Sequence, residues 1–153
     1  MNFFGIQLFP TLVVYACILP GIKLIAADGS GHNGWTVMGA AVCVFAAVLQ
    51  LVADVQMQRF RRQAHKGQLI SFGLWKYARH PNYLGEILMW WGVYLMMLVN
   101  LPNCWYLGVG ALVNTLMFLC ISIPMAEKRL AQYKPEFAAY RRRTRMLLPI
   151  KKK

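Results

Sequence analysis

The stretch RHPNYLGE, residues 79–86, places several polar side chains at the start of a long apolar run. Asn82 and Glu86 are four residues apart, so a helix that begins here puts them on one face, one turn apart. Within a membrane, a carboxylate costs at least about 2.5 to 3.5 kcal/mol unless it faces protein, water or a ligand. Glu86 is therefore a candidate site residue, and Arg79 and Tyr83 add a guanidinium and a hydroxyl beside it.

Two interpretations of Glu86 remain open at this point. In the first, Glu86 pairs with an arginine of a neighbouring loop and only fastens the helices together. In the second, the carboxylate, the amide of Asn82 and the nearby hydroxyl recognise a polar cofactor that carries a ring. The variety of polar groups within one helical turn favours the second interpretation.

A second polar stretch, DVQMQRFRRQ, follows the apolar run at residues 35–53. If it is helical, Asp54, Gln58, Arg61 and Arg62 share one face. A planar guanidinium binds phosphate through two parallel hydrogen bonds, so these arginines are candidate phosphate ligands. The alternative is an interfacial helix whose arginines contact anionic lipid headgroups.

The elements that must position these residues are predicted to be membrane helices. The chain has 153 residues, 58% of them hydrophobic, and it contains four apolar runs. Each run is near the length of about 20 residues that crosses a bilayer, and none alternates like a barrel strand. The sequence predicts an all-α, polytopic membrane protein with one membrane domain. Its expected spans are residues 3–27, 35–53, 82–99 and 104–125.

Basic residues predict the orientation of these spans. The chain has 17 Lys and Arg against 5 Asp and Glu, and the basic residues concentrate in segments 54–81 and 126–153. Loops rich in Lys and Arg remain on the cytoplasmic side, so both segments and both termini are expected there. The membrane is expected to be a bacterial inner membrane or an endoplasmic reticulum. The first apolar run lacks a preceding Lys or Arg, so we expect a retained span and no signal peptide.

The tail after residue 125 is expected to form two short helices, divided at Lys134-Pro135. Its aromatic residues Tyr133, Phe137 and Tyr140 have near-helical spacing and are predicted to pack at the membrane interface. Glu127 is expected just past the fourth span, where it pairs or binds beside a basic cluster.

The sequence offers no pattern for a metal site or for nucleic-acid binding. The histidines His32, His65 and His80 are widely separated, and the four cysteines occur singly. We therefore expect no bound metal. The basic segments are expected to meet membrane lipids and not nucleic acid.

Several motifs occur in a fixed order along the last two thirds of the chain. They are Asp54-x4-Arg59-Phe60-Arg61, Gly73-Leu74-Trp75-x-Tyr77-x-Arg79-His80-Pro81-Asn82-Tyr83-Leu84-Gly85-Glu86, Trp90-Trp91-Gly92, Glu127-Lys128-Arg129, and Lys134-Pro135-x-Phe137-x2-Tyr140-x-Arg142-Arg143-Thr144. Together these motifs resemble the DUF1295 group of the steroid 5-alpha-reductase superfamily. A combination of motifs in order is far more specific than any one of them.

This resemblance implies an integral membrane reductase that passes a hydride from NADPH to an activated double bond in a lipid-like substrate of the steroid or enone type. It implies Glu86 and Tyr83 as the catalytic residues. The residues that it implies for cofactor binding are Asp54, Arg61, Arg79, His80, Asn82, Glu86, Glu127, Tyr140 and Arg143. Members of the superfamily are usually longer, with further N-terminal helices around the substrate, and a homo-oligomer is one way to complete a pocket here.

Two other functions compete with this one. The stretch RHPxYxG and the aromatic, basic tail also resemble isoprenylcysteine carboxyl and phospholipid methyltransferases, which use S-adenosylmethionine. A carboxylate such as Glu86 suits that cationic cofactor, whereas arginine pairs suit the phosphates of NADPH. The third function is a non-catalytic membrane protein that binds anionic lipid or a partner through its basic face, which leaves Asn82 and Glu86 without a role.

Overall fold

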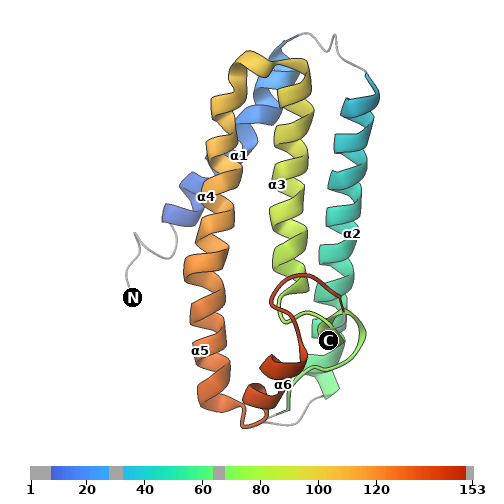
Figure 1. The fold of residues 1–153 in the computed structure, drawn as a ribbon, viewed down its shortest axis with the longest axis vertical. Coiled ribbons are helices and arrows are strands. Elements are labelled where there is room, and N and C mark those ends of the chain that lie inside the picture. Colours follow the sequence, from blue (N-terminus) through green and yellow to red (C-terminus); the bar gives the residue numbers. More distant parts are fainter. Residues whose placement is uncertain (1–7, 28–32, 64–67, 151–153) are drawn as a thin grey trace. The chain divides into compact units, whose positions relative to one another are not determined.

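The structure, a computed structural model, describes residues 8–27, 33–63 and 68–150. Figure 1 shows the helices along the chain, which are α1 (Phe9–Ala26), α2 (Gly34–Gln63), η2 (Gly73–Lys76), α3 (Pro81–Asn100), η3 (Pro102–Gly108), α4 (Val109–Met117), η4 (Phe118–Ser122), α5 (Ile123–Tyr133) and α6 (Phe137–Arg143). Within these ranges the only β-type pairing is one isolated bridge, Ala78 with Arg145. The predicted all-α class is confirmed.

Four helical runs in the described ranges are long and apolar enough to cross a membrane. They are Phe9–Ala26, Gly34–Gln63, Pro81–Asn100 and Pro102–Tyr133. The number of spans agrees with the sequence prediction, and the chain has the helices of a multi-pass membrane protein.

The bounds of the first three helices refine the predicted spans. Helix α1 covers Phe9–Ala26 of the expected residues 3–27, of which residues 3–7 lie outside the described ranges, and it continues through Pro20. Helix α2 continues beyond residue 53 to Gln63, so the polar stretch after Asp54 is helical as expected. Helix α3 begins at Pro81, where the missing N–H of proline has no intrahelical partner to lose.

The fourth span corrects the sequence prediction. The span is expected to end at residue 125, but the helical run that contains it continues to Tyr133. The expected division at Lys134-Pro135 is confirmed, because α5 ends at Tyr133 and α6 begins at Phe137. The π-helical element η4 lies directly before Pro124. Since proline lacks an N–H and its ring crowds the preceding turn, local widening lets the helix pass this residue without a break.

Contacts divide the chain into two compact units. Unit 1 consists of Met1–Phe45 and Ile87–Met117, and unit 2 consists of Ala46–Glu86 and Phe118–Lys153. The single membrane domain therefore stays a prediction. Every residue that the sequence nominated for catalysis or cofactor binding belongs to unit 2.

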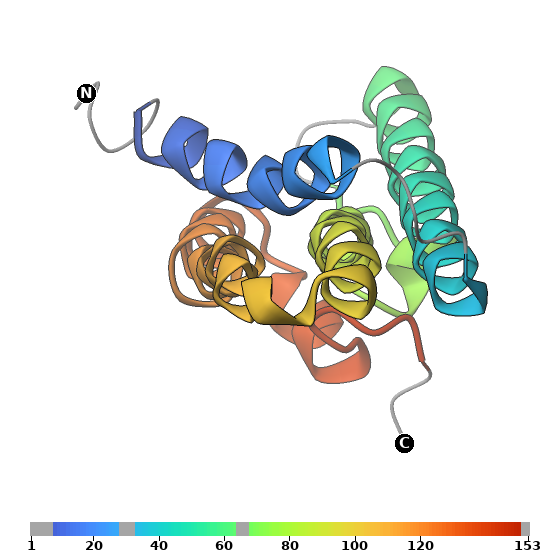
Figure 2. The same cartoon turned by 90° about the horizontal axis from the view of Figure 1, so that it is seen from above.

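Unit 1 is held together by close approaches between helices. Helix α1 packs against α4, as Figure 2 shows. A Cβ on Gly110 would lie 2.5 Å from the backbone of Ala16, and one on Gly92 would lie 2.6 Å from Sγ of Cys43. Both glycines therefore permit backbone contacts that a larger side chain would prevent.

Unit 2 has a small apolar core beside its polar residues. Ala53, Ile70 and Trp75 form this core, and the indole N–H of Trp75 donates to the carbonyl of Ala53 at 3.0 Å. Gly73 has a φ of 58°, a conformation that favours glycine, and the side chain of Gln56 lies against it. These contacts fix the segment 68–80 to the end of α2.

Candidate functional site

A buried charged cluster joins the residues before α3 to α5. Nε of Arg79 donates to Oε1 of Glu127 at 2.7 Å, and Nε2 of His80 lies 3.3 Å from the same oxygen. Nε of Arg141 lies 3.4 Å from the other carboxylate oxygen, and its side chain is 65% exposed. Because Arg79 and Glu127 are nearly enclosed, this is a charge-assisted pair shielded from water.

Arg79 also holds the segment that follows α6. Its Nη1 donates to the carbonyl oxygen of Thr144 at 2.7 Å and to that of Arg141 at 3.3 Å. The backbone N–H of Arg79 donates to the carbonyl of Arg145 at 2.9 Å, and that of His80 donates to Met146 at 3.1 Å. The donors of Arg79 are thus mostly engaged by protein, which leaves little capacity for a phosphate.

Tyr140 is buried inside unit 2, which corrects the prediction that it packs at the membrane interface. Its hydroxyl donates to the carbonyl of Trp75 at 2.6 Å and lies 3.4 Å from that of Ala78. Burial raises the pKa of Tyr140 to about 12, with Arg79 lowering it and Glu127 raising it. Phe137 is buried as well, whereas Tyr133 is 70% exposed. The aromatic stripe is therefore divided between the interior and the surface.

The protonation of His80 decides the charge of this cluster. Burial lowers the pKa of His80 most strongly, the carboxylate of Glu127 raises it, and Arg79 lowers it further. His80 is therefore neutral at pH 7. Two guanidinium groups, those of Arg79 and Arg141, then face the one carboxylate of Glu127, and the cluster carries one excess positive charge.

A cavity of about 730 Å³ lies in unit 2, which we call the Asp54 cavity. Its volume falls in the range of about 300 to 1,000 Å³ that is typical of small-molecule sites. The residues that line it are Asp54, Met57, Gln58, Arg61, Trp75, Arg79, His80, Asn82, Tyr83, Ala126, Arg129, Leu130, Tyr133 and Lys134. Six of the residues nominated from the sequence are among them, drawn from α2, α3 and the segment between these helices.

Several polar groups in the Asp54 cavity have no hydrogen bond or ion pair with a residue in the described ranges. They are the side chains of Asp54, Gln58, Arg61, Asn82 and Arg129, together with the hydroxyl of Tyr83. Polar side chains without protein partners around a cavity are available to a ligand. In this respect the cavity differs from the charged cluster beside it.

The ring of Tyr83 has a fixed position at this cavity. It stacks on the ring of His80, with centroids 5.2 Å apart and an interplanar angle of 7°. Its other neighbour is Phe118, with centroids 4.7 Å apart. Asp54 and Glu86 both lie near enough to act electrostatically on its hydroxyl. Tyr83 is therefore a positioned hydroxyl among acidic groups.

Four nominated residues do not line the Asp54 cavity. Glu86 lies one turn further along α3 and is partly buried, and Tyr140 and Arg143 lie outside the lining. Glu127 lines a second cavity of about 850 Å³, which we call the Arg141 cavity. The structure thus brings together the residues from α2 and α3, and it assigns the tail residues to other surroundings.

The sequence reasoning missed the contribution of α5 to the Asp54 cavity. Ala126, Arg129, Leu130 and Tyr133 all line it and recur at the spacing of one helical face. That spacing was visible in the sequence. The spacing does not by itself show that this helical face lines a cavity, because that depends on how the helix packs against α2 and α3.

The described ranges contain no group of three or more His, Cys, Asp or Glu side chains placed to hold a metal ion. His32 and His65 lie outside these ranges. His80, the third histidine, contacts Glu127 and Tyr83.

Comparisons with known proteins connect this chain to a family. An uncharacterized protein of Schizosaccharomyces pombe is 27% identical over an alignment of 114 residues, and the match covers 61% of this chain and 33% of the relative. The chain therefore matches about a third of that protein's length. No solved structure matches this chain. The family described as "Protein of unknown function (DUF1295)" matches residues 1–144, and the chain belongs to this DUF1295 family.

Proposed function

We propose that this protein is an integral membrane reductase that binds NADPH in the Asp54 cavity and reduces an activated double bond in a lipid-like substrate. The observation that carries the proposal is the set of polar side chains at this cavity that have no hydrogen bond or ion pair with a described residue. The resemblance of its motifs to steroid 5-alpha-reductases supports the choice of cofactor. Membership of the DUF1295 family alone does not distinguish between activities.

The charge of the lining suits an anionic cofactor. The cavity is lined by four cations, Arg61, Arg79, Arg129 and Lys134, and by one acid, Asp54. Arg61 and Arg129 have no ion pair with a described residue, so their guanidinium groups are the best candidates to bind phosphates.

Other residues are suited to the remaining parts of the cofactor and to catalysis. Asn82 offers an amide that would bind the carboxamide of the nicotinamide, and Asp54 offers a carboxylate that would bind a ribose hydroxyl. When bound, NADPH supplies the hydride. The hydroxyl of Tyr83 would donate a proton to the substrate atom on which negative charge develops, and a proton from solvent would then restore the hydroxyl. The negative charge of Glu86 favours this return to the protonated form.

A second candidate function is methyl transfer from S-adenosylmethionine. One observation favours it, because the carboxylate of Asp54 faces the cavity without a hydrogen-bond partner among the described residues. A carboxylate there would stabilise a cationic sulfonium. The two cofactors differ in phosphate, and this difference gives a direct test.

The test is a thermal-shift comparison of the purified protein in detergent with NADPH, NADH, S-adenosylmethionine and S-adenosylhomocysteine. A ligand that binds only the folded state raises the unfolding free energy by about 2.7 kcal/mol at a hundredfold excess over its dissociation constant. We expect NADPH to raise the melting temperature. Arg61→Gln should lower the affinity for NADPH about tenfold, because it removes a charge-assisted hydrogen bond.

Arg62→Gln is the matched control for this variant. Arg62 is the next residue of α2, is exposed and does not line the Asp54 cavity, so its replacement should leave NADPH binding unchanged. A melt that shifts only with S-adenosylmethionine or its product, and is insensitive to Arg61→Gln, would replace the reductase proposal with methyl transfer. If no nucleotide shifts the melt, both proposals are wrong.

A further inference from the structure

We propose that the Arg141 cavity binds one anionic phospholipid, with the headgroup phosphate at its basic side chains and an acyl chain along its apolar side. This cavity shares Arg79 and Lys134 with the Asp54 cavity, but the lipid proposal does not depend on the reductase proposal. The residues that line it are Arg79, Leu119, Ile123, Pro124, Glu127, Lys128, Ala131, Lys134, Pro135, Phe137, Ala138, Arg141, Arg142 and Met146.

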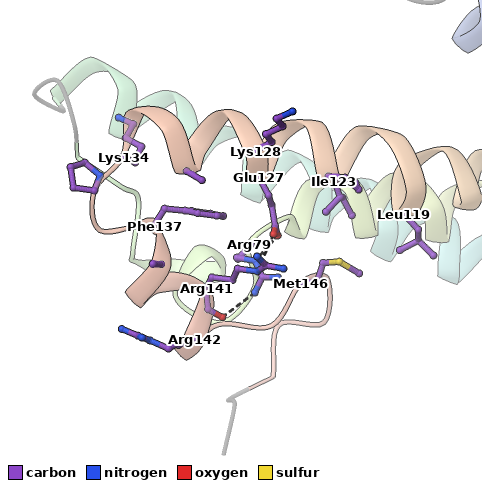
Figure 3. Close-up of a pocket in the computed structure, with 14 residues that line it drawn as sticks. Arg79, Leu119, Ile123, Glu127, Lys128, Lys134, Phe137, Arg141, Arg142 and Met146 are labelled. Atoms are coloured by element: carbon purple, nitrogen blue, oxygen red, sulfur yellow. Dashed lines mark hydrogen bonds and ion pairs between the residues drawn. The ribbon is translucent and has the colours of Figure 1, made fainter.

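Figure 3 shows how these residues lie between α5 and α6. Arg79, Glu127 and Arg141 meet in the middle, Leu119 and Ile123 follow the helical run toward one end, and Lys134 lies toward the other end. The cavity therefore has an apolar end at Leu119 and Ile123, and its basic side chains begin at the charged cluster.

The basic side of the cavity is not neutralised by the protein. Its lining carries five cations and a single carboxylate, that of Glu127. Glu127 already contacts Arg79 and Arg141, and the exposed guanidinium of Arg141 directs only its Nε to that carboxylate. Lys128 and Arg142 make no ion pair with any residue in the described ranges. A phosphate would balance this excess charge.

The apolar side requires more than a phosphate. Leu119, Ile123 and Met146 line it, and Met146 is 37% exposed. An acyl chain would pack against these side chains through many small dispersion contacts. Inorganic phosphate has no apolar part that could contact this side of the cavity.

The order of these features along the chain matches that of a membrane lipid. Leu119 and Ile123 belong to the apolar run Pro102–Tyr133, which is long enough to cross a membrane, and Lys128 follows them toward its end. A phospholipid has the same order, an acyl chain in the hydrocarbon region followed by a phosphate at the surface. The cavity is therefore complementary to a phospholipid in both polarity and charge.

The experiment measures lipid binding by native mass spectrometry of the protein in dodecyl maltoside. The probes are dioleoylphosphatidylglycerol, dioleoylphosphatidylcholine and glycerol 3-phosphate. We expect saturable binding of one phosphatidylglycerol, with weaker binding of phosphatidylcholine and of glycerol 3-phosphate. Equal affinity for the two lipids would overturn the proposal, because charge would then have no role. Glycerol 3-phosphate binding as tightly as the lipid would indicate a site for soluble phosphates instead.

Two matched double variants locate the site. Lys128→Gln with Arg142→Gln removes two cations of the cavity, and Arg129→Gln with Arg143→Gln removes their exposed sequence neighbours, which do not line it. The first pair should lower the affinity for phosphatidylglycerol about 30-fold, since each basic side chain near an anionic headgroup raises that affinity about fivefold. The second pair should change it less than about twofold. Equal losses in both pairs would mean diffuse attraction to the basic surface.

The first variant also separates this proposal from the reductase proposal. Lys128 and Arg142 lie outside the Asp54 cavity, so their double variant should keep the full thermal shift with NADPH. Its unchanged melting temperature without ligand would show that it folds normally. If the unmodified protein binds NADPH but does not bind phosphatidylglycerol, the lipid proposal alone is wrong.

Discussion

The polar residues of unit 2 fall into two groups that differ in their partners. Arg79, His80, Glu127, Tyr140 and Thr144, which we call the Glu127 network, are buried and hydrogen-bonded to protein. The cavity group consists of Asp54, Arg61, Asn82, Tyr83 and Arg129, which line the Asp54 cavity with no such bonds among the described residues. The motifs of the family contain both groups without distinction.

One sequence motif can therefore contain both structural residues and binding residues. A buried charge with protein partners is costly to strip of those partners, at about 3 to 5 kcal/mol. A side chain at an open cavity makes few contacts whose loss destabilises the fold. Variants of the two groups should therefore divide between stability and ligand affinity, and this division can be tested.

The largest effect is expected for Glu127→Gln. This change leaves the guanidinium of Arg79 buried without its carboxylate, so the unfolding free energy should fall by about 3 to 5 kcal/mol. Unfolding of the protein in detergent, followed by circular dichroism, measures this change. Glu136→Gln is the control, because Glu136 is exposed and has no side-chain hydrogen bond in the described ranges, and its effect should stay within about 0.5 kcal/mol. Similar effects for the two variants would mean that the network has no structural role.

A pair of smaller changes tests the division directly. Tyr140→Phe removes the hydroxyl that donates to the carbonyl of Trp75, and leaving that buried acceptor unsatisfied should cost about 1 to 3 kcal/mol. Its affinity for NADPH should stay normal. Asn82→Ala should lower the affinity for NADPH about tenfold and leave the unfolding free energy nearly unchanged. Thermal melts with and without NADPH measure both quantities.

The opposite pattern in this pair would show that Tyr140 contacts the cofactor, as the family resemblance implies. Tyr133→Phe serves as a further control for stability. Tyr133 is 70% exposed and its hydroxyl has no hydrogen bond to a described residue, so its stability should match that of the wild type.

The helices were predictable because their signals are local in the sequence. Apolar length predicted four spans, and Pro81 marked the first residue of α3. The polar side chains after residue 125 predicted an end of the helix there, but the helical run continues to Tyr133. Polar composition limits the length of chain that can lie in the membrane, but it does not end a helix. The helix ends only where Lys134 precedes Pro135.

The site was predictable only in part, for a different reason. The sequence nominated Asp54, Arg61, Asn82 and Tyr83, and these residues line one cavity. Arg62 and Glu86, which were expected on the same helical faces as Arg61 and Asn82, do not line it. The partner of Tyr140 is 65 residues away in the chain, so no local pattern could indicate that its hydroxyl was engaged. The side on which a tail residue lies depends on tertiary packing.

The smallest effect is expected for the pH dependence of stability, and it concerns His80 in the Glu127 network. The pKa of His80 is lowered from 6.5 in the folded protein, mainly by burial. As the pH falls, the unfolded chain therefore binds a proton at this position before the folded protein does. The unfolding free energy should fall below about pH 6.5, by less than about 1.4 kcal/mol per pH unit, until the folded protein also binds the proton. His80→Gln should remove this slope between pH 5.5 and 7.5. A slope of opposite sign would mean that Glu127 favours the imidazolium more than burial opposes it, and His80 would then contribute a charge to the network.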